Sequence, residues 1–87
     1  MDNHSDAADV LNALGNPARV GIVRALLHGE LCVRELQQQL GLPQSTVSQH
    51  LRVLRDRGII RERQEGTRHC YRLVDERVRR VISCLGT

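Results

Sequence analysis

The sequence contains no lysine, phenylalanine or tryptophan, and Tyr71 is its only aromatic residue. A hydrophobic core must therefore be built from leucine, valine and isoleucine. No apolar run approaches the ~20 residues that a membrane-spanning helix needs, and residues 1–10 lack the charged-then-apolar order of an export signal. We therefore expect a cytoplasmic protein without membrane contact, whose three cysteines are reduced at rest and form no disulfide framework.

Sequence features typical of enzymes are also missing. There is no nucleophile–base pair, phosphate-binding loop, pair of carboxylates or CxxC redox motif. A chain of 87 residues can close only one hydrophobic core, so residues 1–87 should form one domain, with residues 1–5 as a flexible tail. The sequence therefore predicts a small protein that is not an enzyme and requires no cofactor.

Basic charge is concentrated in one part of the chain. All 13 basic residues are arginines, which suit bidentate contacts to phosphate and guanine. Residues 44–72 hold seven arginines against three carboxylates, a net charge of +4, whereas residues 1–31 hold two arginines against four carboxylates, a net charge of −2. This asymmetry indicates a polyanionic partner for residues 44–72.

Apolar periodicity and capping residues divide the chain into helices and one hairpin. Asn16 and Asp75 are suited to N-caps, and the glycines at 15, 29, 41, 58 and 86 mark helix ends. The predicted elements are helices over residues 5–14, 17–28, 33–40 and 44–57, strands over 59–63 and 68–73, and a last helix over 75–85. This order, helix-helix-helix-helix-hairpin-helix, predicts a mainly α fold with a small β-hairpin, the winged helix-turn-helix.

The helix predicted over residues 44–57 has a narrow apolar stripe and a polar outer face. Hydroxyl, amide and guanidinium groups on that face could meet base edges or phosphates, and arginines of the hairpin could lie along the sugar-phosphate backbone. The candidate DNA-binding residues are Gln44, Ser45, Thr46, Ser48, Gln49, His50, Arg52, Arg55, Arg63 and Arg68. The alternatives are a face that is merely solvated and, for His50 at the edge of the apolar stripe, a packing or capping role.

Two segments, LGNPARVGIVRALLHGELCVREL and LGLPQSTVSQHLRVLRDRGIIRERQEGTRHCYRL, resemble the ArsR/SmtB family of bacterial metal- and thiol-responsive repressors. The resemblance extends over residues 10–85 and is most specific in STVSQHLRVLRDRGII. It implies a homodimer formed by the first and last helices. It also implies that each subunit places a winged helix on double-stranded DNA at a palindromic operator, and that the dimer leaves the operator when an inducer binds.

The arsenic site of this family is incomplete in the chain. Its third helix typically reads ELCVCDL followed closely by another cysteine, and here Cys32 matches only the first of these three thiols. Arg34 and Gln37 occupy the other two positions. The last helix contains no histidine, so the zinc- and nickel-type site of the family is not expected either.

The remaining candidates for metal or thiol sensing are Cys32, Cys84 and, as the weakest, Cys70. Cys32 precedes a helix whose N-terminus would favour its thiolate, although a small core residue is an equal alternative. Cys84 lies one turn from Arg80 and is the expected partner of Cys32. Cys70 lies on the strand face of Arg68 and Arg72 and is expected to be a bystander or a weak third ligand.

These features predict a DNA-binding repressor that dissociates from its operator when it senses a thiophilic inducer. The inducer would be arsenite, antimonite or another soft metal ion held by the cysteine thiolates. One alternative is a thiol switch in which reactive sulfur or an oxidant links two cysteines. A second alternative is a winged helix used for protein interaction, which the arginines of the predicted reading helix and hairpin disfavour.

Overall fold

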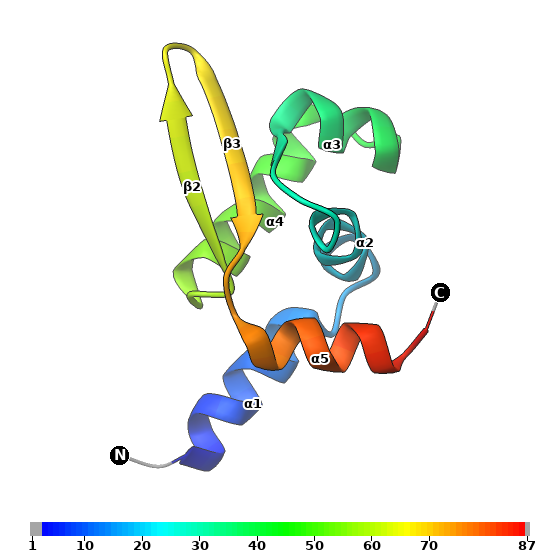
Figure 1. Ribbon diagram of the computed structural model, residues 1–87, viewed down its shortest axis with the longest axis vertical. Helices are drawn as coiled ribbons and strands as arrows, with labels where there is room; N and C mark the ends of the chain where they lie inside the picture. The colour runs from blue at the N-terminus through cyan, green and yellow to red at the C-terminus, as the bar shows by residue number, and fades with distance from the viewer. Residues whose placement is uncertain (1–2, 87) are drawn as a thin grey trace.

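The computed structural model describes residues 3–86. Within them lie α1 (Asn3–Leu14), α2 (Pro17–Leu26), β1 (Leu31–Cys32), α3 (Val33–Leu40), α4 (Gln44–Asp56), β2 (Ile60–Glu65), β3 (Arg68–Leu73) and α5 (Glu76–Cys84) (Figure 1). The helices, the hairpin and their order are those that the sequence predicts, so the winged helix-turn-helix is confirmed. Over the described residues, every helix is too short or too polar to cross a membrane.

Short side chains and glycines define the helix ends. The Asn16 side chain accepts hydrogen bonds from the first-turn amides of α2 at 2.9 and 3.2 Å, and the Asp75 carboxylate caps α5 in the same way. Gly41 ends α3 in the left-handed conformation, with φ of 66°, which glycine adopts without steric cost.

Several predicted boundaries differ from the structure by one or two residues: α4 ends at Asp56, β2 runs over Ile60–Glu65 where 59–63 was predicted, and α5 runs over Glu76–Cys84 where 75–85 was predicted. Two helices near the N-terminus differ by two residues each. Helix α2 ends at Leu26, two residues before the predicted end, because a looser turn precedes Gly29. Helix α1 begins at Asn3, so residues 3–5 are helical where a flexible tail was expected, and residues 1–2 lie outside the described part of the chain. Helix boundaries are set by weak local preferences and commonly shift by one or two residues.

A short third strand, β1, was missed by the sequence analysis. The sheet has the order β1-β3-β2 with both pairs antiparallel, and in it Leu31 lies opposite Tyr71 and Cys32 opposite Cys70. Two residues are too few to show the alternation that marks a strand, and β1 forms only because β3 offers it a free edge. This strand brings the segment before α3 against the wing, the hairpin formed by β2, β3 and their turn.

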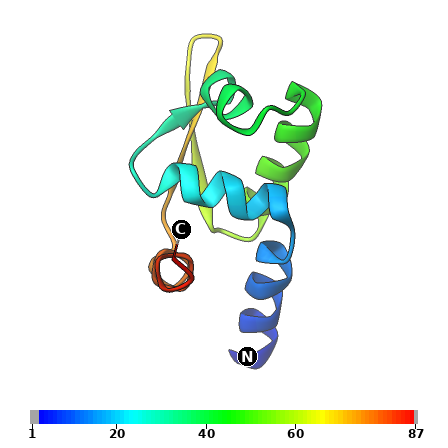
Figure 2. The same cartoon turned by 90° about the vertical axis from the view of Figure 1, so that its right-hand side faces the viewer.

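The core is aliphatic, as the composition requires. Its fully buried side chains come from α2, α3, α4, α5 and the start of the wing: Ile22, Val23, Leu26, Leu36, Val47, Leu51, Leu54, Ile59, Val78 and Ile82. Around this core the molecule has two distinct ends (Figures 1 and 2). Helices α3 and α4 and the tip of the wing lie at one end, whereas α1 and α5 lie together at the other.

Candidate DNA-binding face and cysteine pair

Helix α4 presents its polar residues to solvent, as the sequence predicts. Gln44, Ser45, Ser48, Gln49, Arg52 and Arg55 are exposed, and Thr46 and His50 are half-buried at the margin of the core. No side chain caps the first turn of α4, because its N-cap is Pro43. The amides of that turn are therefore available to an anion such as a DNA phosphate.

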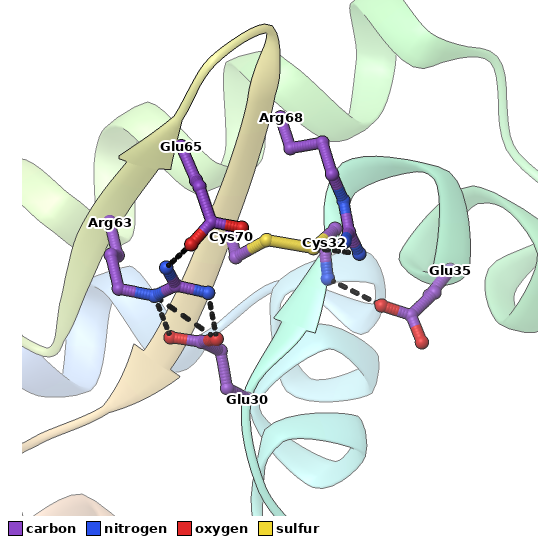
Figure 3. Close-up of polar contacts among 7 residues, drawn as sticks. All are labelled: Glu30, Cys32, Glu35, Arg63, Glu65, Arg68 and Cys70. Atoms are coloured by element: carbon purple, nitrogen blue, oxygen red, sulfur yellow. Dashed lines mark hydrogen bonds and ion pairs between the residues drawn. A yellow bond between two sulfur atoms is a disulfide. The ribbon is translucent and has the colours of Figure 1, made fainter.

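Arg63 of the wing is held by two carboxylates. Its guanidinium donates to Glu30, with Nη2–Oε2 2.8 Å, and to Glu65, with Nη1–Oε2 3.0 Å (Figure 3). The hydrogen bond from Arg63 holds the pKa of Glu30 below its ordinary value. Glu30 is not among the residues predicted from the sequence, and it immediately precedes the unpredicted strand β1.

A second cluster joins the wing to the end of α4. Glu62 accepts from Arg55 of α4 at 2.7 Å and lies 2.6 Å from Nδ1 of His69 on β3. The hydrogen bond with His69, followed by that from Arg55, lowers the pKa of Glu62. Arg55, one of the predicted DNA contacts, is therefore paired within the molecule in this structure.

Cys32 and Cys70 form a disulfide between β1 and β3, with 3.8 Å between their Cα atoms (Figure 3). The bond is possible because the two residues are direct partners in the antiparallel register. Cys32 is 9 % exposed and Cys70 only 1 %. Arg68, the other wing arginine predicted to contact phosphate, donates from Nη2 to Cys32 Sγ at 3.1 Å.

This pairing corrects the expected roles of the cysteines. The expected partner of Cys32, Cys84, is an exposed free thiol on α5, and Cys70, ranked weakest, is the residue bonded to Cys32. The error follows from the missed strand, because without β1 nothing in the sequence places Cys32 beside β3.

The structure offers few ligands for a metal or metalloid ion. In residues 3–86 there is no group of three or more histidine, cysteine, aspartate or glutamate side chains arranged to hold a metal ion. Arg34 and Gln37, which stand in two of the family's arsenic-ligand positions, line a cavity beside Cys32. The disulfide itself leaves no thiolate on Cys32 or Cys70.

An apolar surface lies at the opposite end of the molecule. Leu11 of α1, Val81 of α5 and Leu85, the residue that follows α5, are 60 %, 40 % and 66 % exposed. Between the two helices is a cavity of about 180 Å³ lined mainly by apolar side chains, among them Leu11 and Val81. These are the helices that the family resemblance assigns to dimer formation.

The arrangement is that of known regulators. The model of the family described as "Bacterial regulatory protein, arsR family" matches residues 16–62. The biofilm growth-associated repressor of Xylella fastidiosa is 37 % identical over 83 residues, which cover 95 % of this chain and 73 % of the repressor.

Two solved structures are similar over nearly the whole chain. Reduced HlyU from Vibrio cholerae has a TM-score of 0.90 and 38 % identity, and the match covers 95 % of this chain and 87 % of HlyU. The homodimeric winged helix-turn-helix DNA-binding domain Mb0332 from Mycobacterium bovis has a TM-score of 0.84 and 33 % identity, covering 93 % of this chain and 75 % of that one. The chain therefore belongs to the ArsR/SmtB family of bacterial regulatory proteins and is a winged helix-turn-helix transcriptional repressor.

Proposed function

We propose that the chain acts as a homodimer that binds a palindromic operator when Cys32 and Cys70 are reduced and leaves it when they become linked. The disulfide between β1 and β3 is the observation that supports this proposal most directly. It joins the N-terminus of α3, the first helix of the helix-turn-helix, to the wing. Both parts must adapt to the DNA together, so a covalent bond between them can change operator affinity.

DNA contact is assigned to α4 and the wing. The exposed hydroxyls, amides and Arg52 of α4 are suited to base edges in the major groove, and the uncapped first turn of α4 to a phosphate. Arg63 and Arg68 of the wing are placed for the sugar-phosphate backbone, which orients the protein without reading sequence.

Dimer formation is assigned to α1 and α5. Leu11, Val81 and Leu85 are exposed apolar residues of α1 and of the segment formed by α5 and its C-cap. These helices lie at the end opposite to α3 and the wing tip (Figure 1). A second copy of the chain would cover this surface, as the homodimeric state of the similar Mb0332 domain suggests. Two reading helices held in this way would match a two-fold symmetric operator.

The disulfide-linked structure has the features expected of the released state. Three arginines that are predicted to contact DNA make side-chain contacts within the molecule. Arg55 donates to Glu62, Arg63 donates to Glu30 and Glu65, and Arg68 donates to Cys32. Each engagement competes with a DNA phosphate. We place the protein in the cytoplasm, where thiols are kept reduced, so the bond would form only when an oxidising signal arrives.

The thiol switch is better supported than sensing of arsenite, antimonite or another soft metal ion. Arg34 and Gln37 stand where the arsenic-responsive site has cysteines, which leaves two neighbouring thiols instead of three. The similar HlyU was solved in a form named as reduced, which fits a family member with distinct redox states. A covalent link also suits the energetics, because nearly complete release requires the two states to differ by about 10⁴-fold in operator affinity.

The proposal is tested by operator binding under reducing and oxidising conditions. Binding of the purified protein to DNA from upstream of its own gene is measured by fluorescence anisotropy, for the wild type, Cys70→Ser and the matched control Cys84→Ser. We expect oxidation to weaken binding by about 10⁴-fold in the wild type and in Cys84→Ser, and to leave Cys70→Ser unchanged. Equal release of Cys70→Ser by oxidant, or release of the reduced wild type by arsenite without a disulfide, would contradict the proposal.

A further inference from the structure

A polar cavity of about 670 Å³ lies beside Cys32, between α3, the start of α4 and the wing. Its lining includes Cys32, Arg34, Gln37, Gln44, Arg68 and His69. The dimer surface and the exposed face of α4 lie elsewhere, and only Gln44 and Arg68 belong both to this cavity and to the candidate DNA contacts. Most of this cavity is therefore used neither by the proposed DNA contacts nor by the proposed dimer surface.

We propose that this cavity binds a low-molecular-weight disulfide bearing carboxylates, which oxidises Cys32 and Cys70 by thiol–disulfide exchange. The inference rests on the proposed thiol switch and names its oxidant class and entry site. The ligand's carboxylates pair with Arg34 and Arg68, and its sulfurs lie against Cys32 Sγ.

The charged side chains that line the cavity favour binding of an anion. Arg34 and Arg68 contribute two guanidiniums, whereas Glu35 is the one carboxylate of the lining and already accepts a hydrogen bond from the Cys32 amide at 2.9 Å. Amide side chains of Gln37 and Gln44 add neutral donors. Arginine forks recognise carboxylates bidentately, so a dicarboxylate or larger polyanion is favoured over a neutral or cationic molecule.

The volume of the cavity beside Cys32 is large enough for a ligand of the size of a short peptide. Binding sites for small organic ligands commonly measure roughly 300–1,000 Å³, and this cavity falls within that range. A peroxide would need only a path to the sulfur and no cavity of this size. A disulfide of a small carboxylate-bearing thiol uses both the space and the charges.

The two cysteines have unequal access to the cavity. Cys32 lines it and is 9 % exposed, whereas Cys70 does not line it and is 1 % exposed. The Arg68 guanidinium at 3.1 Å and the N-terminus of α3 both stabilise negative charge on Cys32 Sγ. Cys32 is therefore the attacking thiolate, and Cys70, its partner in the register, is the resolving thiol.

The exchange then proceeds in two balanced steps. The Cys32 thiolate attacks one sulfur of the bound disulfide RSSR, forming a Cys32–SR mixed disulfide and releasing RS⁻. The Cys70 thiol loses its proton and attacks Cys32 Sγ, which forms the Cys32–Cys70 bond and releases a second RS⁻. The two protein thiols are oxidised, and RSSR is reduced to two RSH once the thiolates take up protons.

The test measures the rate of Cys32–Cys70 formation in the full reduced chain by quenched, alkylated intact-mass analysis. The two probes are oxidised glutathione, which carries carboxylates, and 2-hydroxyethyl disulfide, which is neutral. Arg34→Gln should slow oxidation by glutathione disulfide about tenfold or more and leave the neutral probe unaffected. Arg80→Gln on α5 is the matched control and should change neither rate. In Cys70→Ser, glutathione disulfide should leave one glutathionyl group on Cys32.

The outcomes separate the two proposals. Equal rates with the two probes, or a rate with glutathione disulfide that Arg34→Gln does not change, would overturn the assigned ligand class while leaving the thiol switch intact. An adduct on Cys84 instead of Cys32 in Cys70→Ser would overturn the site. Rapid formation of the Cys32–Cys70 bond without loss of operator affinity would instead contradict the proposed function and leave this inference standing.

Discussion

At the scale of single residues, carboxylates pair with arginines of the wing. Arg63 is bound by Glu30 and Glu65, and only Glu65 lies on the wing itself. Glu30 reaches Arg63 from the segment before β1, where the disulfide also lies. The carboxylate that occupies Arg63 is therefore placed by the same short strand that places Cys32.

Replacing Glu30 with glutamine should increase the affinity of the reduced protein for DNA several-fold. The change removes the carboxylate that competes with phosphate for Arg63, although it also removes one negative charge from the neighbourhood of the DNA. A double-mutant cycle with Arg63→Gln separates the two effects. In the Arg63→Gln background, Glu30→Gln can no longer free Arg63, so any remaining gain in affinity comes from the lost negative charge. Anisotropy titrations at low salt measure all four proteins, and an equal effect of Glu30→Gln in both backgrounds would mean that the pair does not control Arg63.

At the scale of elements, capping residues were the most reliable sequence signals. Asn16, Gly41 and Asp75 each end or begin a helix where the sequence predicts it, because a cap acts through its own side chain or backbone within one turn. β1 could not be found in this way, since its two residues are a strand only by pairing with β3. The Cys32–Cys70 bond and the Glu30–Arg63 pair depend on that tertiary contact and were missed with it.

The N-cap of α5 gives a stability prediction with a defined pH dependence. The Arg77 side chain, followed by the amides of Val78 and Arg77, lowers the pKa of Asp75. A carboxyl group with a lowered folded-state pKa contributes stability above its ordinary pKa and loses it as the pH falls through the folded value. Asp75→Ala should therefore lower the free energy of unfolding by about 1 kcal/mol at neutral pH and by less in acid.

Urea denaturation followed by circular dichroism at neutral and acidic pH measures this effect. Asp75→Asn is the matched control, because asparagine retains the capping oxygen without a titrating charge. It should lose less stability than Asp75→Ala at neutral pH, and its stability should depend less on pH than that of the wild type. A pH-independent cost of Asp75→Ala would show that the charge of the cap contributes nothing.

At the scale of the whole molecule, the proposed DNA-binding face and the proposed dimer surface lie at opposite ends. Helices α1 and α5 lie far from the wing tip in both views, so a dimer formed through them would leave both reading faces open (Figures 1 and 2). Leu11→Asp places a charge on this surface and should convert the dimer to a monomer. Because a monomer contacts only half of the operator, DNA affinity should fall by about 100-fold or more.

Light scattering and anisotropy together measure the effect of Leu11→Asp. Ala8→Asp is the matched control, because Ala8 is also exposed on α1 but does not line the cavity between α1 and α5. Both variants should keep the circular dichroism spectrum of the wild type, since neither position is buried. A dimeric Leu11→Asp protein would place the dimer contact elsewhere.

The salt dependence of DNA binding connects the cysteine pair to the whole dimer. Each phosphate contact made by an arginine lowers the slope of log K against log salt by about 0.9. If the linked state withholds Arg63 in both subunits, the reduced dimer should have a slope steeper than that of the oxidised dimer by about 2. Titrations of the Cys84→Ser dimer over a range of salt concentrations measure both slopes without interference from the exposed thiol. Parallel slopes with a lower affinity after oxidation would instead mean that the bond moves the two reading helices apart and leaves the wing contacts in place.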